Sequence, residues 1–116
     1  VKADAYGHGL LPVARAAAAA GARRFAVATL DEAVALRRDG VPHEILLLAP
    51  LLPEEAETAA RNDIVPFVSG AGYLDAMAEA ARHAPLPLRC YLAVDTGMGR
   101  EGLDPEISCT PGEMEC

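Results

Sequence analysis

Ile45-Leu46-Leu47-Leu48-Ala49 is the stretch of sequence that decides the fold. A strand with one face in water alternates apolar and polar residues, whereas a strand covered on both faces of a parallel sheet reads as a continuous apolar run. Residues 45–49 form such a run without a polar side chain. We therefore expect them to form a buried strand of a parallel sheet, in a protein of the α/β class.

Similar runs lie on both sides of this stretch, at residues 25–28, 64–68 and 88–94. Their first residues are about twenty positions apart, a spacing typical of repeated strand–helix units. Pro66 weakens the run at residues 64–68, because proline cannot donate a hydrogen bond to a sheet ladder. The regular spacing nevertheless predicts a strand there.

The segments between these runs carry helix signals. Residues 11–20 are rich in alanine, the residue with the highest helix propensity, and Gly21 follows where a helix would end. Pro53 is placed to begin another helix, and a further helix is expected at residues 73–82. Each gap between apolar runs is thus expected to hold one helix.

The clearest helix start is at residues 29–32, Thr-Leu-Asp-Glu, which match a capping box. In the helix that follows, the spacing predicts that Ala33 and Leu36 face the core and that residues 37–39 face water. Gly40 is expected to end this helix.

Repeats of this kind are compatible with two architectures, a doubly wound open sheet and a closed (β/α)8 barrel. No G-x-G-x-x-G pattern follows a strand, which disfavours a dinucleotide-binding fold. The sequence has 116 residues, far fewer than the roughly 250 of a complete barrel. If the fold is a barrel, the chain is expected to be a fragment of a larger enzyme.

Composition narrows the function classes. The net charge of −7 argues against a nucleic-acid partner, and no apolar run approaches the roughly 20 residues that cross a bilayer. The alanine-rich residues 10–22 lack the basic region of a signal peptide. Three cysteines without clustered spacing predict neither a disulfide framework nor a zinc site, and Cys90 is expected to be a buried thiol. We expect a cytoplasmic protein.

Two segments carry candidate chemistry. The first, Val1-Lys2-Ala3-Asp4-Ala5-Tyr6-Gly7-His8-Gly9, places a lysine at the expected end of a strand, before a turn with two glycines. A partly desolvated amine at such an edge can attack a carbonyl, as a Schiff base with pyridoxal phosphate requires. The second segment is Tyr91-Leu92-Ala93-Val94-Asp95-Thr96-Gly97-Met98-Gly99-Arg100. Its Asp95 is expected to cap backbone amides of the turn that precedes Arg100.

Residues 2–9 resemble the cofactor-lysine segment of bacterial alanine racemases, which are pyridoxal-phosphate enzymes of fold type III, and residues 91–100 resemble their substrate-arginine segment. The resemblance implies part of a TIM barrel, roughly its first five strands, over residues 1–103. Residues 104–116 lack a helical stripe where the family has a helix. We expect them to be an atypical tail, such as a truncation or frameshift scar.

The resemblance also implies roles for individual residues. Lys2 would hold pyridoxal phosphate and exchange the α-proton of the substrate on one face, and Tyr6 would bind the cofactor phosphate. Arg100 would hold the substrate carboxylate and the phenolic oxygen of the cofactor. Leu48 aligns with an apolar residue of the cofactor pocket, although a core position is the simpler interpretation. The second proton-transfer group of the family, a tyrosine from the C-terminal domain of the partner subunit, implies a homodimer.

One position departs from the family pattern. Many members carry a lysine, often carbamylated, where this chain has Ala93, and that lysine helps to hold the arginine. Several interpretations therefore stay open. The leading one is a racemase that supplies D-alanine for peptidoglycan, with the fragment itself inactive. The alternatives are a serine racemase, another fold-type-III protein, or a degraded paralogue that acts as a binding module.

Overall fold

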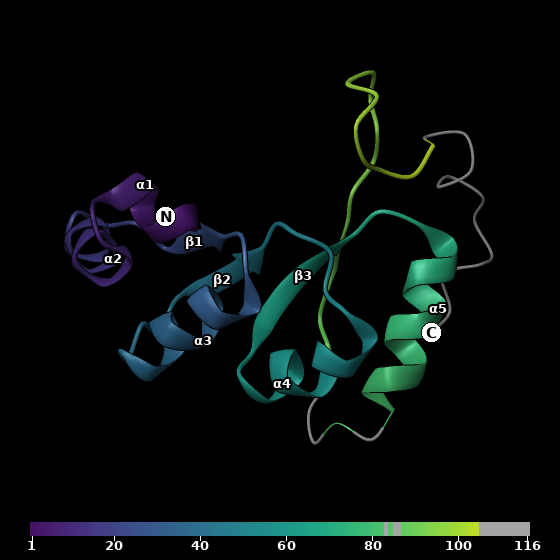
Figure 1. The fold of residues 1–116 in the computed structure, drawn as a ribbon, viewed down its shortest axis with the longest axis horizontal. Helices are drawn as coiled ribbons and strands as arrows, with labels where there is room; N and C mark the ends of the chain where they lie inside the picture. Colours follow the sequence, from purple (N-terminus) through teal and green to yellow (C-terminus); the bar gives the residue numbers. More distant parts are fainter. Residues whose placement is uncertain (83, 85–86, 105–116) are drawn as a thin grey trace.

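The computed structural model describes residues 1–82, 84 and 87–104. Within them, four parallel strands form one sheet in which each strand lies beside the next in sequence, in the order β1-β2-β3-β4 (Figure 1). The strands are β1 (Arg24–Val27), β2 (Glu44–Leu47), β3 (Ile64–Val68) and β4 (Tyr91–Leu92). The predicted α/β class and the predicted strand–helix rhythm are confirmed.

Helices connect the strands. They are α1 (Lys2–Gly7), α2 (Leu10–Ala19), α3 (Leu30–Arg38), the short 3-10 helix η1 (Pro53–Glu55) with α4 (Ala56–Arg61), and α5 (Ala71–Ala81). The capping box predicted before α3 is present, with the Glu32 N–H donating to Thr29 Oγ1 at 3.2 Å and the Thr29 N–H donating to Glu32 Oε2 at 3.4 Å.

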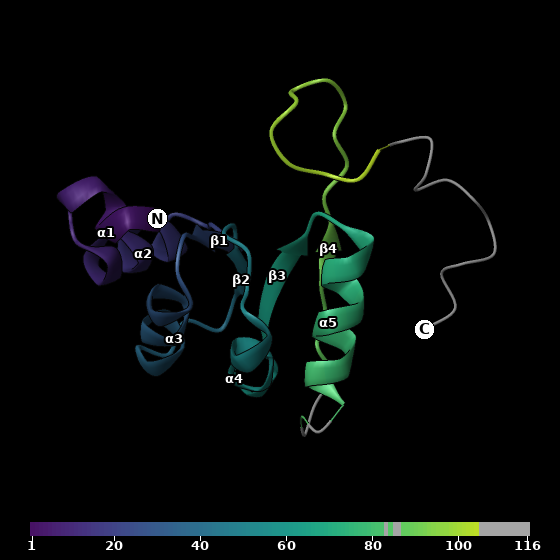
Figure 2. The same ribbon diagram turned by 45° about the vertical axis from the view of Figure 1, so that its right-hand side comes forward.

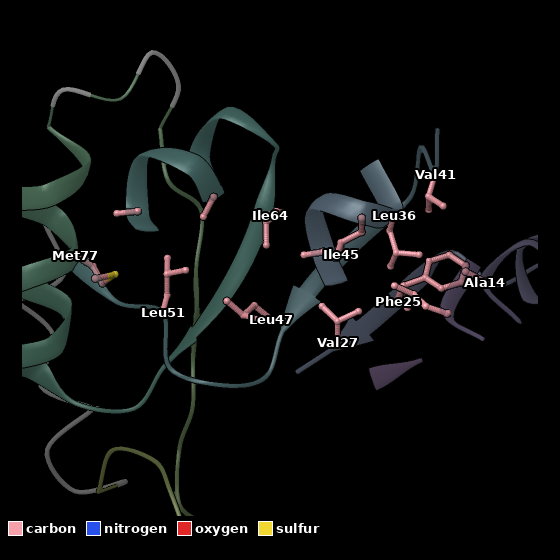
Figure 3. Packing of buried hydrophobic residues seen from close by; sticks show 14 residues of the cluster. Ala14, Phe25, Val27, Leu36, Val41, Ile45, Leu47, Leu51, Ile64 and Met77 are labelled. Atoms are coloured by element: carbon pink, nitrogen blue, oxygen red, sulfur yellow. The ribbon is translucent and has the colours of Figure 1, made fainter. Parts of the chain in front are cut away.

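The core lies on one face of the sheet at β1 and β2, whereas consecutive residues of β3 are buried. Alternate residues of β1 and β2 are buried, namely Phe25, Val27, Ile45 and Leu47, and they form a single apolar cluster with side chains from α2, α3, α4 and α5 (Figure 3). Their neighbours, such as Leu46, are only half-buried. A doubly wound sheet carries helices on both faces, whereas a barrel wall carries them on one. The one-sided packing therefore favours the barrel.

Pro66 does not interrupt the third strand. It is fully buried within β3 and lies opposite Leu47 of β2 in the parallel register. The sequence led us to expect a strand that ends at Lys2. Of that strand the chain contains only Val1 before Lys2, and the amino group of Val1 donates to the carbonyl oxygen of Ala26 at 2.9 Å. The N-terminal residue therefore lies beside β1.

Cys90 is exposed, so the prediction of a buried thiol is wrong. The strand expected at residues 88–94 contracts to Tyr91 and Leu92, and β4 is the last strand of the described sheet. Cys90 therefore lies just before this short strand and not inside it. Cys109 and Cys116, like most of the predicted tail at residues 104–116, lie outside the described residues.

Arg37 also corrects an expectation, because it does not simply face water. Its guanidinium donates to the carbonyl oxygens of Val41, His43, Asn62 and Asp63 at 2.6 to 2.8 Å, and its side chain is only 16% exposed. Burial lowers the pKa of Arg37 from its ordinary value, and Asp63 partly offsets this. The arginine joins the end of α3 to the loops that precede β2 and β3.

Asp39, which was also expected in water, has a side chain only 11% exposed because Arg15 of α2 pairs with it. Arg38 is exposed as predicted. No helix in the described part of the chain is both long and apolar enough to span a bilayer.

Candidate active site

An open hollow of about 530 Å³ lies where the strands end. Ala28, Leu48 and Ala93, which directly follow β1, β2 and β4, line it. Ala28 and Leu48 continue the alternation of the strands on the face that the helices leave uncovered. The hollow is thus at the carboxyl-terminal mouth of the barrel wall, where barrel enzymes build their active sites. The remaining lining residues are Lys2, Ala49, Phe67, Met98, Arg100 and Glu101.

Three of the four residues singled out from the sequence meet at this hollow. Lys2 and Arg100, from opposite ends of the described chain, line it together with Leu48. Leu48 is 39% exposed, so the simpler interpretation of a core leucine is wrong. Tyr6 is 73% exposed and does not line the hollow, and its predicted contact with a cofactor phosphate stays a prediction.

Lys2 is the only lysine in the sequence. It is exposed, and neither its amine nor the guanidinium of Arg100 forms a hydrogen bond or ion pair with the residues that the structure describes. The hollow therefore contains the Lys2 amine, which can act as a nucleophile, and the planar Arg100 guanidinium, which can donate hydrogen bonds to a carboxylate. Phe67 and Glu101 complete its wall, and sequence reasoning missed both, because no local pattern shows which side chains meet at the end of a sheet.

The turn after Lys2 is a left-handed helical turn. Residues 3–6, none of them glycine, have φ values between 52° and 54°. Left-handed helical backbone costs roughly 1–2 kcal/mol per residue for L-amino acids, so such a turn persists only where surrounding contacts determine it. The sequence predicted a glycine-assisted turn here, but the strained residues lie before Gly7 rather than at the glycines.

Several contacts hold this turn. The Ala5 N–H donates to the Val1 carbonyl at 3.0 Å, and the Gly9 N–H donates to the Asp4 carbonyl at 3.0 Å. The Asp4 carboxylate accepts from the Leu10 N–H at 2.7 Å, which joins the turn to the start of α2. The Asp4 N–H donates to Glu32 Oε1 at 2.8 Å.

Glu32 has more than the capping role that the sequence indicated. Its second carboxylate oxygen accepts from the N–H of Ala28 at 2.9 Å and from that of Thr29. Burial raises the pKa of Glu32, but the hydrogen bonds from the backbone N–H groups, those of Asp4 and Ala28 foremost, outweigh it and lower the pKa below its ordinary value. The carboxylate is therefore held ionised between the Lys2 turn and the end of β1.

The loop that carries Arg100 is held by its own residues. Asp95 Oδ1 accepts from the N–H of Gly97 at 2.9 Å and from that of Gly99 at 3.0 Å. These hydrogen bonds, that of Gly99 first, lower the pKa of Asp95 below its ordinary value. The capping predicted for Asp95 is confirmed. Figure 2 shows this loop, in yellow-green, extending past the end of β4.

Leu103 closes the same loop. Its N–H donates to the Ala93 carbonyl at 2.7 Å, and its carbonyl accepts from the Asp95 N–H at 2.9 Å. Gly102, which precedes it, has a φ of +135°, and a Cβ there would lie 2.4 Å from the Asp95 nitrogen. The loop can therefore close only with glycine at this position. The sequence did not indicate this requirement, because it arises where Gly102 approaches Asp95, seven positions earlier in the chain.

Comparisons with known proteins agree with this geometry. The family model described as the N-terminal domain of alanine racemase matches residues 1–109. The alanine racemases of Latilactobacillus sakei and Geobacillus stearothermophilus are each 47% identical to this chain, over 91% of it and over 28% and 27% of their own lengths. The chain thus spans less than a third of these relatives.

Among solved structures, alanine racemase from a D-cycloserine-producing Streptomyces lavendulae matches with a TM-score of 0.83 and 42% identity, over 91% of this chain and 28% of that one. A histidine racemase from Leuconostoc mesenteroides matches with a TM-score of 0.82 and 39% identity, over 89% of this chain and 28% of that one. The neighbours named alanine racemase have a TIM-barrel N-terminal domain, and this chain corresponds to part of it, as predicted from the sequence.

Proposed function

Because this chain belongs to the alanine racemase family, we propose that it forms part of a pyridoxal-phosphate enzyme that interconverts L- and D-alanine and supplies D-alanine for peptidoglycan in the cytoplasm. One observation carries the proposal: the only lysine of the sequence and the Arg100 guanidinium line a single hollow at the carboxyl ends of the strands.

The residues of the hollow fit pyridoxal phosphate. Its volume of about 530 Å³ lies in the range of small-molecule and cofactor sites, roughly 300–1,000 Å³. Lys2 would hold the cofactor through its ε-amine, Arg100 would contact its phenolic oxygen, and Leu48 and Ala28 would supply an apolar wall. Tyr6 would bind the phosphate, which requires its exposed ring to turn toward the hollow. When bound, the cofactor supplies a conjugated ring that stabilises negative charge at the substrate Cα.

The residues of this chain then have distinct tasks. Nζ of Lys2 removes a proton from Cα of the amino acid, or returns it, on one face of the substrate. The Arg100 guanidinium binds the substrate carboxylate, which fixes Cα in the hollow with its proton directed to one face. Asp95 holds the backbone of the Arg100 loop through its contacts with Gly97 and Gly99. Ala93, where many family members carry a lysine, cannot hold the guanidinium in the way that a lysine does.

Racemisation also needs an acid–base group on the opposite face. We propose that a tyrosine of a partner subunit supplies it, in a homodimer, so that residues 1–116 alone do not racemise alanine. Conversion of L-alanine to D-alanine by the isolated 116-residue chain would contradict this part of the proposal.

A second candidate is a racemase for another amino acid, such as serine. The solved relative with 39% identity is named a histidine racemase, so similar chains act on different substrates. Alanine at position 93 also leaves more space beside Arg100 than a lysine would. Comparing kcat/KM for alanine, serine and histidine distinguishes the two candidates.

The test of the proposed function is Lys2→Ala in the product of the complete reading frame that encodes these residues. Because Lys2 is the only lysine of the sequence and lines the hollow, we expect borohydride reduction to attach a pyridoxyl group to Lys2 in the unmodified protein. Peptide mass spectrometry locates this group. The variant should lose this label and at least about a thousandfold in kcat.

Arg38→Ala is the matched control, since Arg38 is an exposed basic residue of α3 that does not line the hollow. It should retain both the label and the activity. A pyridoxyl group on another side chain of the unmodified protein would overturn the assignment of Lys2.

A further inference from the structure

We propose that Glu32 is a positioning residue for Lys2: its carboxylate fixes the left-handed turn of residues 3–6 against the end of β1, so that the Lys2 amine stays directed into the hollow. This inference rests on the proposed function only in naming Lys2 as the reacting group.

The two oxygens of the Glu32 carboxylate divide their contacts. Oε1 accepts from the N–H of Asp4, two residues after Lys2, at 2.8 Å. Oε2 accepts from the N–H of Ala28 at 2.9 Å, and Ala28 both ends the β1 segment and lines the hollow. A single side chain therefore connects the lysine turn with the wall that the lysine must face.

The other hydrogen bonds of the turn are local. Those between Ala5 and Val1, between Gly9 and Asp4, and between Leu10 and Asp4 join residues at most six positions apart, so they mainly keep the shape of the turn. Val1, at the start of the turn, is held beside β1 by its hydrogen bond to the Ala26 carbonyl at 2.9 Å. Among the described residues, the hydrogen bond from Asp4 to Glu32 is the contact that holds the residues after Lys2 to a distant element. Figure 1 shows α1 beside β1.

Four consecutive non-glycine residues in left-handed conformation have a strong tendency to relax toward right-handed backbone. Release of the Asp4 N–H would allow that relaxation, and it would turn Lys2, which lies between Val1 and the strained residues, away from the hollow. A misplacement of about 1 Å is enough to slow a catalysed step by about a hundredfold. Loss of Glu32 should therefore lower kcat through Lys2, although Glu32 does not line the hollow.

The capping role of Glu32 can be separated from its contact with the turn. Thr29→Ala removes the hydroxyl that caps the Glu32 N–H and so weakens the start of α3, but leaves the contact between Glu32 and Asp4 in place. Glu32→Gln replaces one of two acceptor oxygens by a donor, so it must give up either Asp4 or Ala28. Glu32→Asp keeps the charge but is one methylene too short to reach both.

The experiment uses the product of the complete reading frame with Glu32→Gln, Glu32→Asp and Thr29→Ala, at a temperature where all are folded by circular dichroism. For both Glu32 variants we expect exchange of the Asp4 amide hydrogen at least about tenfold faster and kcat lower by about ten- to a hundredfold, with KM changed less than about threefold. Thr29→Ala should keep kcat within about twofold and leave exchange at Asp4 unchanged.

Equal loss of kcat in Thr29→Ala and Glu32→Gln would overturn the proposal, because it would mean that only the start of α3 matters. If one Glu32 variant does not fold, the other decides by the same readouts. A protein without pyridoxyl label at Lys2 would refute the proposed function instead. Exchange at Asp4 then still decides whether Glu32 holds the turn: unchanged exchange in both Glu32 variants would reject that hold.

Discussion

The two charged residues of the hollow are delivered by loops that are built in opposite ways. The Lys2 turn places four consecutive non-glycine residues, 3–6, in left-handed backbone before Gly7, and it is tied to α3 through Glu32. The Arg100 loop places glycines at its positive-φ positions and is held by Asp95 and by Leu103 within the same segment. The lysine turn thus depends on a distant element for its position, whereas the arginine loop is largely self-contained.

The difference shows that the geometry of the arginine loop is determined by neighbouring residues in the sequence. A segment of nine residues, 95–103, contains the carboxylate, the amides it caps and the residue that closes the loop. The lysine turn stores strain that its own contacts do not relieve, so its geometry belongs to the assembled fold. Disturbing the arginine loop should require a change inside it, while the lysine turn should respond to changes elsewhere.

The largest expected effect of a change within either loop comes from Gly102→Ala. A Cβ at this position would lie 2.4 Å from the Asp95 nitrogen and 2.7 Å from the Val94 carbonyl carbon, in backbone with a φ of +135°. The substitution should separate Leu103 from Ala93 and Asp95, and should lower the free energy of unfolding by about 3 kcal/mol. Urea unfolding of the complete protein measures this, and KM for the amino acid should rise because Arg100 moves.

Gly72→Ala is the matched control. A Cβ on Gly72 meets nothing within 4 Å, and the residue lies within α5 at an ordinary φ. Alanine there should leave KM unchanged and should raise the free energy of unfolding by up to about 1 kcal/mol. If Gly102→Ala proved as harmless as Gly72→Ala, the closed form of the arginine loop described here would be wrong.

A smaller effect, with its sign reversed, is expected in the lysine turn. Ala3 is exposed and has a φ of 53°, a conformation that glycine adopts without strain. Ala3→Gly should therefore raise the free energy of unfolding by roughly 0.5–1 kcal/mol, after allowance for the greater freedom of glycine in the unfolded chain.

The same substitution in ordinary helix provides the comparison. Ala16 is an exposed residue inside α2, so Ala16→Gly should lower the free energy of unfolding by about 1 kcal/mol. Parallel thermal or urea unfolding of the two variants checks the contrast. Losses of similar size at both positions would show that the turn after Lys2 is not left-handed in solution.

Much of the fold could be predicted because its signals are local. The twenty-residue spacing and the capping box at Thr29 each depend on neighbours in sequence, and both are confirmed. The continuous apolar run around Ile45 does form a parallel strand, but the prediction that both of its faces are buried is wrong, because Leu46 is half-buried and Leu48 is exposed. Arg37 could not be predicted, since its four carbonyl partners come from two loops that meet only in the folded chain. Cys90 was misassigned because an apolar run does not reveal where its strand begins, and β4 starts only at Tyr91.

The residues of the site also fall into those that local motifs identify and those that depend on distant contacts. Lys2 and Arg100 were found from motifs, and the structure brings them to one hollow. Phe67 and Gly102 were missed, because their importance comes from which strands and loops approach one another. Glu32 was found as a cap but not as the partner of Asp4, twenty-eight positions away. Sequence patterns therefore identify the reacting groups more readily than the residues that aim them.

The smallest expected effect is an acid dependence that distinguishes the loops. Asp95 and Glu32 both have a pKa below the ordinary value in the folded chain, because backbone N–H groups donate to their ionised forms. A carboxylate whose folded pKa is depressed contributes its full stabilisation above its unfolded value, about 3.9 for aspartate and 4.3 for glutamate. That stabilisation is lost as the pH falls through the lower folded value.

Both loops should therefore loosen below about pH 4, and a substitution should uncouple them. Asp95→Asn keeps one acceptor oxygen for Gly97 or Gly99 but removes the titrating group. The amide NMR signals of Gly97 and Gly99 should then lose their acid-dependent shift, while that of Asp4, which follows Glu32, should keep it. A shift at Asp4 that also disappears in Asp95→Asn would mean that the two loops respond to acid as one unit, and the separation between a self-contained arginine loop and a supported lysine turn would fail.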